Sequence, residues 1–290
     1  MSYPSNINTS NDSSLFAPLV TQAQFQAYET SVARQLVTVF DAPMNTGKTL
    51  QVPVWARVAA QLITDESAAS DAATGTSSAT ITLGEHVVYE QITDMLRDSA
   101  YNDVFSQIGD QAGRAIAESL DKQVFSNFSN FSTDLGGAGH ELIVQDILKA
   151  AATLRSQRLS GPFYAVVHPA AAYNLKKNLT TTLPYSGATA GSQLGALSNV
   201  GNSVLEGFYI GTVAGVQIFE SALVPTSGTD SVAAVFAKTG LGHAMRGSID
   251  MNTLYLPAAR ATDVVLKAVG GATVLNNLHG VAITCDAQIN

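Results

Sequence analysis

One apolar period in the sequence continues far longer than an ordinary helix requires. It covers residues 94–131, and its members lie four positions apart: Val104, Ile108, Ala112, Ile116, Leu120, Val124 and Phe128. The other faces carry charged residues, including the carboxylates Asp94, Asp98, Asp103 and Asp110. This pattern predicts an amphipathic helix with a solvated or neighbour-facing acidic stripe. At about 1.5 Å per residue, such a helix would span on the order of 50 Å. No other element of the sequence constrains the fold as strongly.

Two segments with a period of two precede this helix. In residues 48–58, Leu50, Val52 and Val54 lie on one side, and Pro53 between them favours an edge strand. The second segment, residues 79–92, reads as another strand. Small and polar residues without an apolar period separate the two. The arrangement predicts a long hairpin arm that reaches away from the body.

The remaining segments alternate between helical and extended patterns. Residues 1–14 are polar and are expected to form a mobile arm, and an amphipathic helix is expected from Thr21 to near Phe40. A breaker at residues 134–140 ends the long helix. After it, the patterns predict helices at 141–159 and 170–179, a buried strand at 162–169, a Gly- and Ser-rich loop at 180–203, and mostly strands from residue 207 onward. The fold class is α+β, without a repeat.

Charge and composition exclude several classes of function. Fifteen basic and twenty-three acidic residues give a net charge of −8, and no short window is dominated by Lys or Arg, so we expect no dedicated nucleic-acid grip. Only 13% of the residues are charged, which favours a surface covered by neighbouring copies. Cys285 is the only cysteine, so an internal disulfide is excluded and a core position in a reducing compartment is expected. There is no signal-peptide pattern and no apolar run of about 18 residues, so we expect a soluble chain made in the cytoplasm, with no membrane partner.

One stretch matches a relaxed phosphate-loop pattern, "APMNTGKT" from Ala42 to Thr49. A phosphate loop joins a buried strand to a helix, whose first amides hold the phosphate. Here the preceding residues continue a helical period, and Pro53 follows where the helix should form its second turn. We therefore interpret the match as a chance occurrence in a helix-to-strand turn, with Lys48 as a solvated or interface charge.

No other motif anchors an enzyme. The five histidines are scattered, and we interpret them as structural or surface residues: His86, His140, His168, His243 and His279. There is no Gly-x-Ser-x-Gly elbow, and "GLGHAM" has Met245 where a dinucleotide loop needs its third glycine. The expectation is no catalytic residue, no cofactor and no metal site.

The order of these elements resembles that of the major capsid proteins of tailed phages, the Hong Kong 97-like fold. The likeness covers almost the whole chain, and it is carried by "KTLQVPVWARV", "ATITLGEHVVYEQI", "DMLRDSAYNDVFSQIGDQAGRAIAESLDKQVF", "PFYAVVHPAAAYNL" and "GFYIGTVAGVQIFESALVP". It implies an N-terminal arm, an extended β-hairpin (E-loop), a long spine helix, a peripheral domain and an axial domain. The implied boundaries are 1–40 for the arm and short helix, 41–93 for the hairpin and its base strands, 94–139 for the spine helix of the peripheral domain, 140–238 for the axial domain, 239–271 for return strands of the peripheral domain, and 272–290 for a C-terminal axial stretch.

The resemblance implies a major head protein that self-assembles as hexamers and pentamers into an icosahedral shell around double-stranded DNA. Its implied partners are other copies of the chain, a portal at one vertex and the enclosed double-stranded DNA. The DNA lies close to the shell without being bound specifically. A separate scaffolding protein is expected because the sequence has no long N-terminal helical extension, and a cement or decoration protein fits the same picture. Such a protein is located in the virion.

Some members of that family link a hairpin lysine covalently to a neighbour. The present sequence has no lysine from Ala56 to Gly84, so we predict a shell without covalent crosslinks. By their positions in the strand arms, five charged residues are candidates for contacts between subunits: Arg57, Glu85, Glu90, Arg246 and Arg260. Three alternatives remain open at this point: an encapsulin-type bacterial compartment, a P-loop ATPase, which is disfavoured, and an α+β surface or adhesion protein without a shell.

Overall fold

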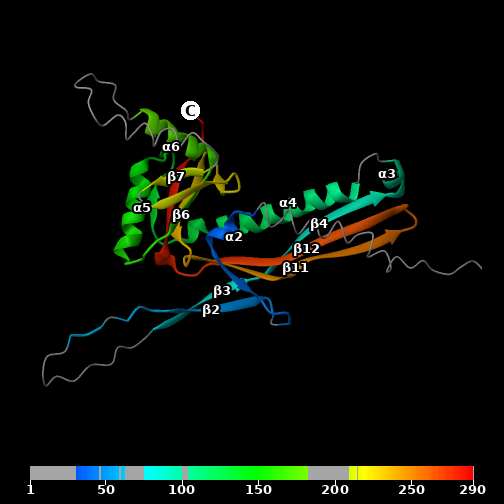
Figure 1. The fold of residues 1–290 in the computed structure, drawn as a ribbon, viewed down its shortest axis with the longest axis horizontal. Helices are drawn as coiled ribbons and strands as arrows, with labels where there is room; N and C mark the ends of the chain where they lie inside the picture. Colours follow the sequence, from blue (N-terminus) through cyan, green and yellow to red (C-terminus); the bar gives the residue numbers. More distant parts are fainter. Residues whose placement is uncertain are drawn as a thin grey trace, which may run out of the picture.

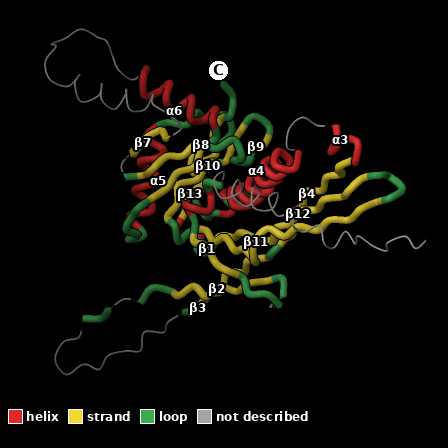
Figure 2. The backbone as a smooth tube through the Cα atoms, turned by 45° about the vertical axis from the view of Figure 1, so that its right-hand side comes forward, coloured by secondary structure: helices red, strands yellow, loops and turns green. Residues whose placement is uncertain are grey.

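The structure is a computed structural model that describes residues 31–45, 47–58, 60–62, 75–99, 104–181, 209–213 and 215–289. One sheet lies along a long helix, a second sheet packs against the C-terminal end of that helix, and a two-stranded hairpin projects from the first sheet (Figures 1 and 2). Helices and strands are mixed along the chain, so the α+β prediction is confirmed. The expected polar arm at 1–14 and most of the expected loop at 180–203 lie outside the described residues.

The elongated end of the molecule is a four-stranded sheet with the order β1-β11-β12-β4. Its strands are β1 (Thr38–Asp41), β11 (Leu241–Leu256), β12 (Ala261–Val274) and β4 (Gly84–Thr93). The long helix α4 (Val104–Phe125) lies along one face of this sheet (Figure 1). Between them is an apolar core in which Ile116 and Leu120 from the helix meet Val264 and Leu266 from β12.

The other end is a sheet with the order β5-β13-β10-β6-β8-β7, with β9 paired to β10. Its strands are β5 (Asp134–Gly136), β6 (Phe163–Val167), β7 (Tyr209–Val213), β8 (Val216–Glu220), β9 (Thr226–Ser227), β10 (Asp230–Ala237) and β13 (Gly280–Asp286). Helices α5 (Val144–Ser156) and α6 (Pro169–Thr181) cover one face through residues such as Ile147 and Leu175. The opposite face packs on the end of α4, so central strands such as β10 are apolar on both sides.

The predicted long helix is real but shorter than expected. The structure has two helices, α3 (Asp94–Ser99) and α4, on either side of residues 100–103, which lie outside the described residues. The α4 helix ends at Phe125 because the side chains of Ser126 and Asn127 donate hydrogen bonds to the Gln123 carbonyl, and a 3₁₀ turn (η2, Phe128–Asn130) follows. At about 1.5 Å per residue, α4 is roughly 33 Å long, not 50 Å. The expected breaker at 134–140 contains β5, which pairs with β13.

The predicted hairpin is also present, with one correction. Strand β2 (Thr49–Trp55) pairs only with β3 (Thr76–Thr82) within the described residues, so the edge strand inferred from Pro53 is confirmed. The single strand expected at 79–92 is two strands, because the chain leaves the hairpin at Leu83 and continues as β4 beside β12. The expected tip at 64–78 lies mostly outside the described residues, and its last part belongs to β3.

Two adjacent glycines in β12 let the hairpin and the helix approach the sheet from opposite faces. A Cβ at Gly270 would lie 2.6 Å from Leu120 Cδ2 of α4, and one at Gly271 would lie 2.3 Å from the Thr82 carbonyl oxygen of β3. At Gly271 the clash is with backbone, so glycine is required, whereas at Gly270 the end of the Leu120 side chain would have to shift. The root of the hairpin therefore lies directly against the sheet face opposite α4.

The helix expected from Thr21 to near Phe40 is partly wrong. Within the described residues, α2 (Ala33–Leu36) is a single turn, and the chain becomes extended at Val37. Residues 38–41 form β1, which pairs in parallel with β11 from Thr38↔Gly242 to Asp41↔Met245. A partner strand thus overrides the apolar spacing, since Thr and Val favour an extended chain wherever a sheet edge is available. The expected part at 21–30 lies outside the described residues.

Candidate interaction surfaces

The segment that matches the phosphate-loop pattern, Ala42 to Thr49, forms a turn between two strands. The preceding element is β1 and not the expected helix, so that part of the sequence argument was wrong. The following element is β2, as expected, so no helix N-terminus is available to hold a phosphate. Asn45 and Gly47 have left-handed φ values of 66° and 81°, which suits a tight turn, and Lys48 is exposed at the root of the hairpin.

The side chains that most often carry chemistry are dispersed. Among the described residues, no group of three or more His, Cys, Asp or Glu side chains is placed to hold a metal ion. Cys285 is buried beside Ser231, which confirms the expected core position, and burial raises the pKa of its thiol. None of the described helices combines the length and hydrophobicity needed to span a bilayer.

Of the five predicted contact residues, the structure brings two into one row. Glu85 of β4 and Arg246 of β11 both pair with Val269, so they lie on either side of β12 in the same cross-strand row. Arg246 also holds the turn below the hairpin, because its guanidinium donates a hydrogen bond to the Gly47 carbonyl. A contact with a neighbouring subunit through this row stays a prediction.

The other three predicted residues lie apart from that row. Glu90 is half-buried on β4, and Arg260 is exposed in the β11–β12 turn with a left-handed φ of 47°. Arg57 is exposed just beyond the end of β2. Their roles likewise stay predictions.

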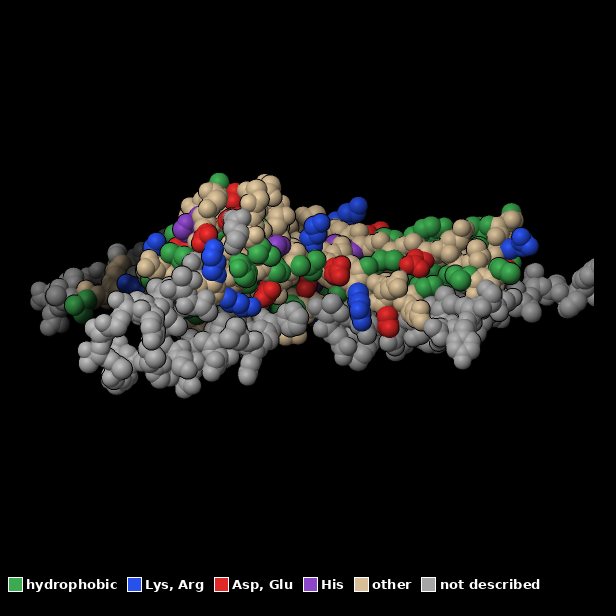
Figure 3. Space-filling model, turned by 90° about the horizontal axis from the view of Figure 1, so that it is seen from above, with side chains coloured by type: hydrophobic (Ala, Val, Ile, Leu, Met, Phe, Trp, Pro, Cys, Tyr) green, Lys and Arg blue, Asp and Glu red, His purple; other side chains and the backbone are tan. Residues whose placement is uncertain are grey.

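The hairpin and the sheet leave apolar side chains uncovered. The hairpin root is anchored, because Leu50 and Val52 pack against buried Ile81 and Ala244. Farther along, Trp55 is 69% exposed. On the sheet, Val87, Tyr89 and Leu254 are also exposed. In Figure 3 the visible charged side chains are scattered among hydrophobic and uncharged ones.

A buried carboxylate ties the N-terminal segment to the long helix. Asp121 of α4 accepts hydrogen bonds from Ser31 Oγ at 2.6 Å, from the Val32 amide at 2.9 Å and from the Ala33 amide at 3.3 Å. It thereby caps the start of α2 with a side chain from another element. Burial raises the pKa of Asp121, and these hydrogen bonds act in the opposite direction.

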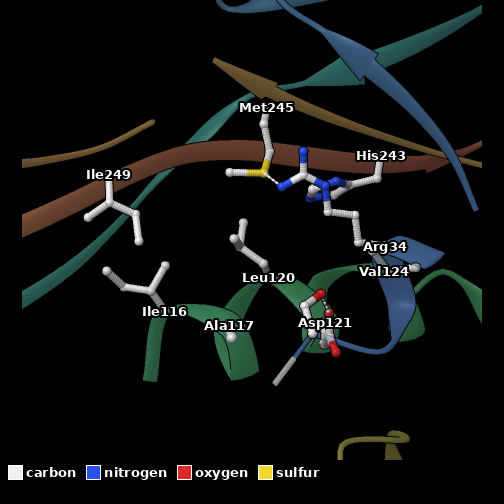
Figure 4. Close-up of a pocket in the computed structure, with 10 residues that line it drawn as sticks. Arg34, Ile116, Ala117, Leu120, Asp121, Val124, His243, Met245 and Ile249 are labelled. Carbon is white, nitrogen blue, oxygen red and sulfur yellow. Dashed lines mark hydrogen bonds between the residues drawn. The ribbon is translucent and has the colours of Figure 1, made fainter. Parts of the chain in front are cut away.

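A small cavity of about 30 Å³ lies beside this cap, between α2, α4 and β11 (Figure 4). His243 and Arg34 point into it, and Arg34 Nη1 lies 3.5 Å from Met245 Sδ. His243 is 2% exposed, and neither of its ring nitrogens has a hydrogen-bond partner in the described part of the chain. Burial, with smaller effects from Arg34 and His86, lowers the pKa of His243 from 6.5 to about 4.

This histidine predicts a loss of stability in mild acid. Between pH 6.5 and 4 the unfolded chain binds a proton at His243 that the folded chain does not. The free energy of unfolding therefore decreases as the pH is lowered from 6.5 to 4, and it levels off below pH 4. The lowered pKa of His243 corresponds to a loss of about 3 kcal/mol in the free energy of unfolding across this range. We expect His243→Gln to weaken the pH dependence of urea unfolding of the subunit between pH 6.5 and 4. Identical slopes for the variant and the parent would contradict the assignment.

Several of these residues escaped the sequence prediction. Asp121 lies beside Leu120 in the helical period, but nothing in the sequence indicates that it caps a segment ninety positions away. His243 was interpreted as a structural histidine, and its lack of partners becomes visible only in three dimensions. The exposure of Trp55 was readable, since it falls on the side of β2 opposite Leu50, Val52 and Val54.

The sequence was compared with models of protein families and with curated proteins. A family model described as phage capsid protein matches residues 78–276, which is most of the chain. A search of the curated proteins found no match.

Solved capsid structures of two phages and of a GTA particle share the fold. The capsid structure of the cyanophage P-SCSP1u has 18% identity and a TM-score of 0.64, with 86% of each chain covered. The capsid of Ralstonia phage GP4 has 9% identity and a TM-score of 0.68, with 87% of each chain covered. The capsid of a native GTA particle has 13% identity and a TM-score of 0.65, covering 91% of this chain and 90% of that one. Since the family model spans most of the sequence, the chain belongs to the phage capsid protein family.

Proposed function

We propose that this phage capsid protein is the major head protein of a tailed phage, made in the host cytoplasm. It assembles as hexamers and pentamers into an icosahedral shell that encloses double-stranded DNA. The observation that carries the proposal is the β2–β3 hairpin, which projects from the body and pairs only with itself within the described residues (Figure 1). An isolated two-stranded ribbon is only marginally stable in water. Lying across a neighbouring subunit would bury its exposed side.

We also propose the domain boundaries that the resemblance to the major capsid proteins of tailed phages implies. We assign 1–40 to the N-terminal arm and short helix, 41–93 to the extended hairpin and its base strands, 94–139 and 239–271 to a peripheral domain, and 140–238 with 272–290 to an axial domain. In support, β11 and most of β12 join the sheet along α4, and β6, β8, β10 and β13 join the other sheet. A scaffolding protein, a portal and a cement protein are the proposed partners besides the chain itself.

Electron cryomicroscopy of the purified particles tests the proposal. The expected result is a closed icosahedral shell with five- and six-subunit capsomers and packaged double-stranded DNA. A shell filled with protein cargo would instead identify an encapsulin-type compartment, and a chain that forms no shell would contradict the proposal altogether.

The shell is expected to lack covalent links between subunits. No lysine lies between Ala56 and Gly84, so the outer part of the hairpin, beyond its root at Lys48, has no amine for an amide bond to a neighbour. Particles heated in denaturant should run as a single monomer band on a denaturing gel. A ladder of covalent oligomers would contradict this expectation.

A further inference from the structure

A groove of about 610 Å³ lies between the outer end of the hairpin and the body of the same subunit. One wall is β2 with the residues that follow it, up to Arg57. The opposite wall is formed by residues 157–159 after α5 and by the segment between β12 and β13. The groove is thus open between two separate parts of the fold.

Its walls hold residue types that dominate binding energy in protein interfaces. Trp55 is the only tryptophan of the chain and is 69% exposed, and Leu278 on the opposite wall is 52% exposed. Arg57 and Arg158 also line the groove, and both are exposed. Trp and Arg are the residues most enriched among interface hot spots. An exposed tryptophan that lines one groove with two exposed arginines therefore indicates a surface for another molecule.

Arg158 occupies a backbone position that normally selects glycine. Its φ is +59°, and its amide donates a hydrogen bond to the Arg155 carbonyl at the end of α5. A left-handed conformation costs a non-glycine residue roughly 1 kcal/mol or more. Strain of this kind is more often tolerated where the side chain has a task. The Arg158 guanidinium interacts favourably with the negative end of the α5 helix dipole. That interaction does not require the side chain to line the groove.

The groove is positively charged in a negatively charged chain. Of the described residues that line it, only Arg57 and Arg158 carry a full charge at neutral pH, and none is Asp or Glu. Neither arginine takes part in an ion pair with the described residues. Burial lowers the pKa of His279, so this third basic side chain stays neutral at pH 7. The groove thus selects an acidic occupant.

The sequence of the chain itself contains a matching segment. Residues 62–71, "LITDESAASD", carry the carboxylates Asp65, Glu66 and Asp71, and no Lys or Arg lies between Arg57 and Arg97. The segment begins with two apolar residues, of which Leu62 is 98% exposed. The described residues after β2, up to Leu62, lead away from the body (Figure 1), so the groove of one subunit is filled more easily by another copy.

We propose that the groove between Trp55, Arg57, Arg158 and Leu278 receives the acidic hairpin segment 62–71 of a neighbouring copy. The inference rests on the proposed function, because it requires subunits that assemble through their hairpins. Leu62 and Ile63 contact Trp55 and Leu278, and the carboxylates pair with the two arginines. Charge complementarity also fixes which end of the hairpin enters the groove.

Charge reversal on each side tests this pairing. Arg57→Glu with Arg158→Glu should lower the fraction of subunits in sedimenting particles at least tenfold, and so should Asp65→Lys with Glu66→Lys. Combining all four substitutions should restore assembly to within about threefold of the parent, because the pairs are rebuilt with opposite sign. The control is Lys122→Glu, a charge reversal at one position on an exposed face of α4, which should assemble like the parent.

The outcomes separate this inference from the shell itself. If the parent assembles and both reversals assemble equally well, the groove is not the docking site, although the shell stands. If the four substitutions together fail to restore assembly while each variant subunit stays folded, the pairing is also overturned. If the arginine variants assemble but lose bound DNA, the groove contacts nucleic acid and the inference is wrong. An Asp65→Cys, Arg158→Cys variant should form disulfide-linked ladders in particles, which neither single variant forms.

Discussion

Replacing residues 57–74 with an Asn-Gly turn will leave a folded subunit that no longer assembles. The Ala56 amide donates a hydrogen bond to the Gly75 carbonyl at 2.9 Å, so a two-residue loop can close the hairpin at that point. The β2–β3 ladder and the cluster around Ile81 remain intact. The shortened hairpin no longer reaches a neighbour, and a tenfold loss of association needs only about 1.4 kcal/mol. We expect the assembled fraction to fall by more than that.

Circular dichroism and gradient sedimentation of the shortened chain provide the measurement. Its control replaces residues 63–74 with a Gly- and Ser-rich segment of equal length, which separates the length of the arm from its sequence. Particles formed by the shortened chain at the yield of the parent would show that the arm does not hold subunits together.

Phe128→Ala will cause the largest loss of subunit stability among single substitutions. The Phe128 side chain is fully buried, and its ring centroid lies 5.3 Å from that of Phe125 and 5.6 Å from that of Phe236. It packs where the end of α4 meets the second sheet, so the cavity would open between the two halves of the molecule. Truncation of a buried phenylalanine costs about 3–5 kcal/mol, a large part of the stability of an ordinary domain.

Urea unfolding of the unassembled subunit measures this effect. Val58→Ala, at a 51% exposed side chain, is the matched control and should change stability by less than about 0.5 kcal/mol. A Phe128→Ala cost as small as that of the control would mean that the junction between α4 and the second sheet is not a core.

The single strand expected at residues 79–92 is two strands in the structure, and the apolar pattern of the sequence does not mark the division. Ile81 and Leu83 are buried at odd positions, whereas His86, Val88 and Ile92 turn inward at even positions. The slip in phase at Gly84 marks the point where the chain leaves β3 for β4. The sequence conceals it, because Val87 and Tyr89 continue the odd-numbered apolar phase of Ile81 and Leu83 and yet are exposed. Which strand each half pairs with was not readable, because it depends on the close approach at Gly271.

The ends of the helices depended on contacts that spacing does not encode. The four-residue period continues from Val124 to Phe128, yet α4 ends at Phe125 and Phe128 enters the core from a 3₁₀ turn. Likewise, Val39 fits the helical period but lies in β1, because β11 offers a parallel partner. In both cases tertiary contacts override the local period.

The candidate surfaces were less predictable than the fold. Charged residues in strands can be named from sequence, but the row shared by Glu85 and Arg246 requires the register of three strands. The groove beside Trp55 combines segments about one hundred and two hundred residues apart along the chain. No short-range pattern connects Arg57, Arg158 and Leu278.

Sedimentation of the purified full-length chain, followed by electron microscopy of the fastest fraction, tests the central claim most directly. A shell protein should sediment as capsomers and closed particles of uniform size. A chain that remains a monomer or small oligomer, with and without co-expressed phage head proteins, would contradict the account.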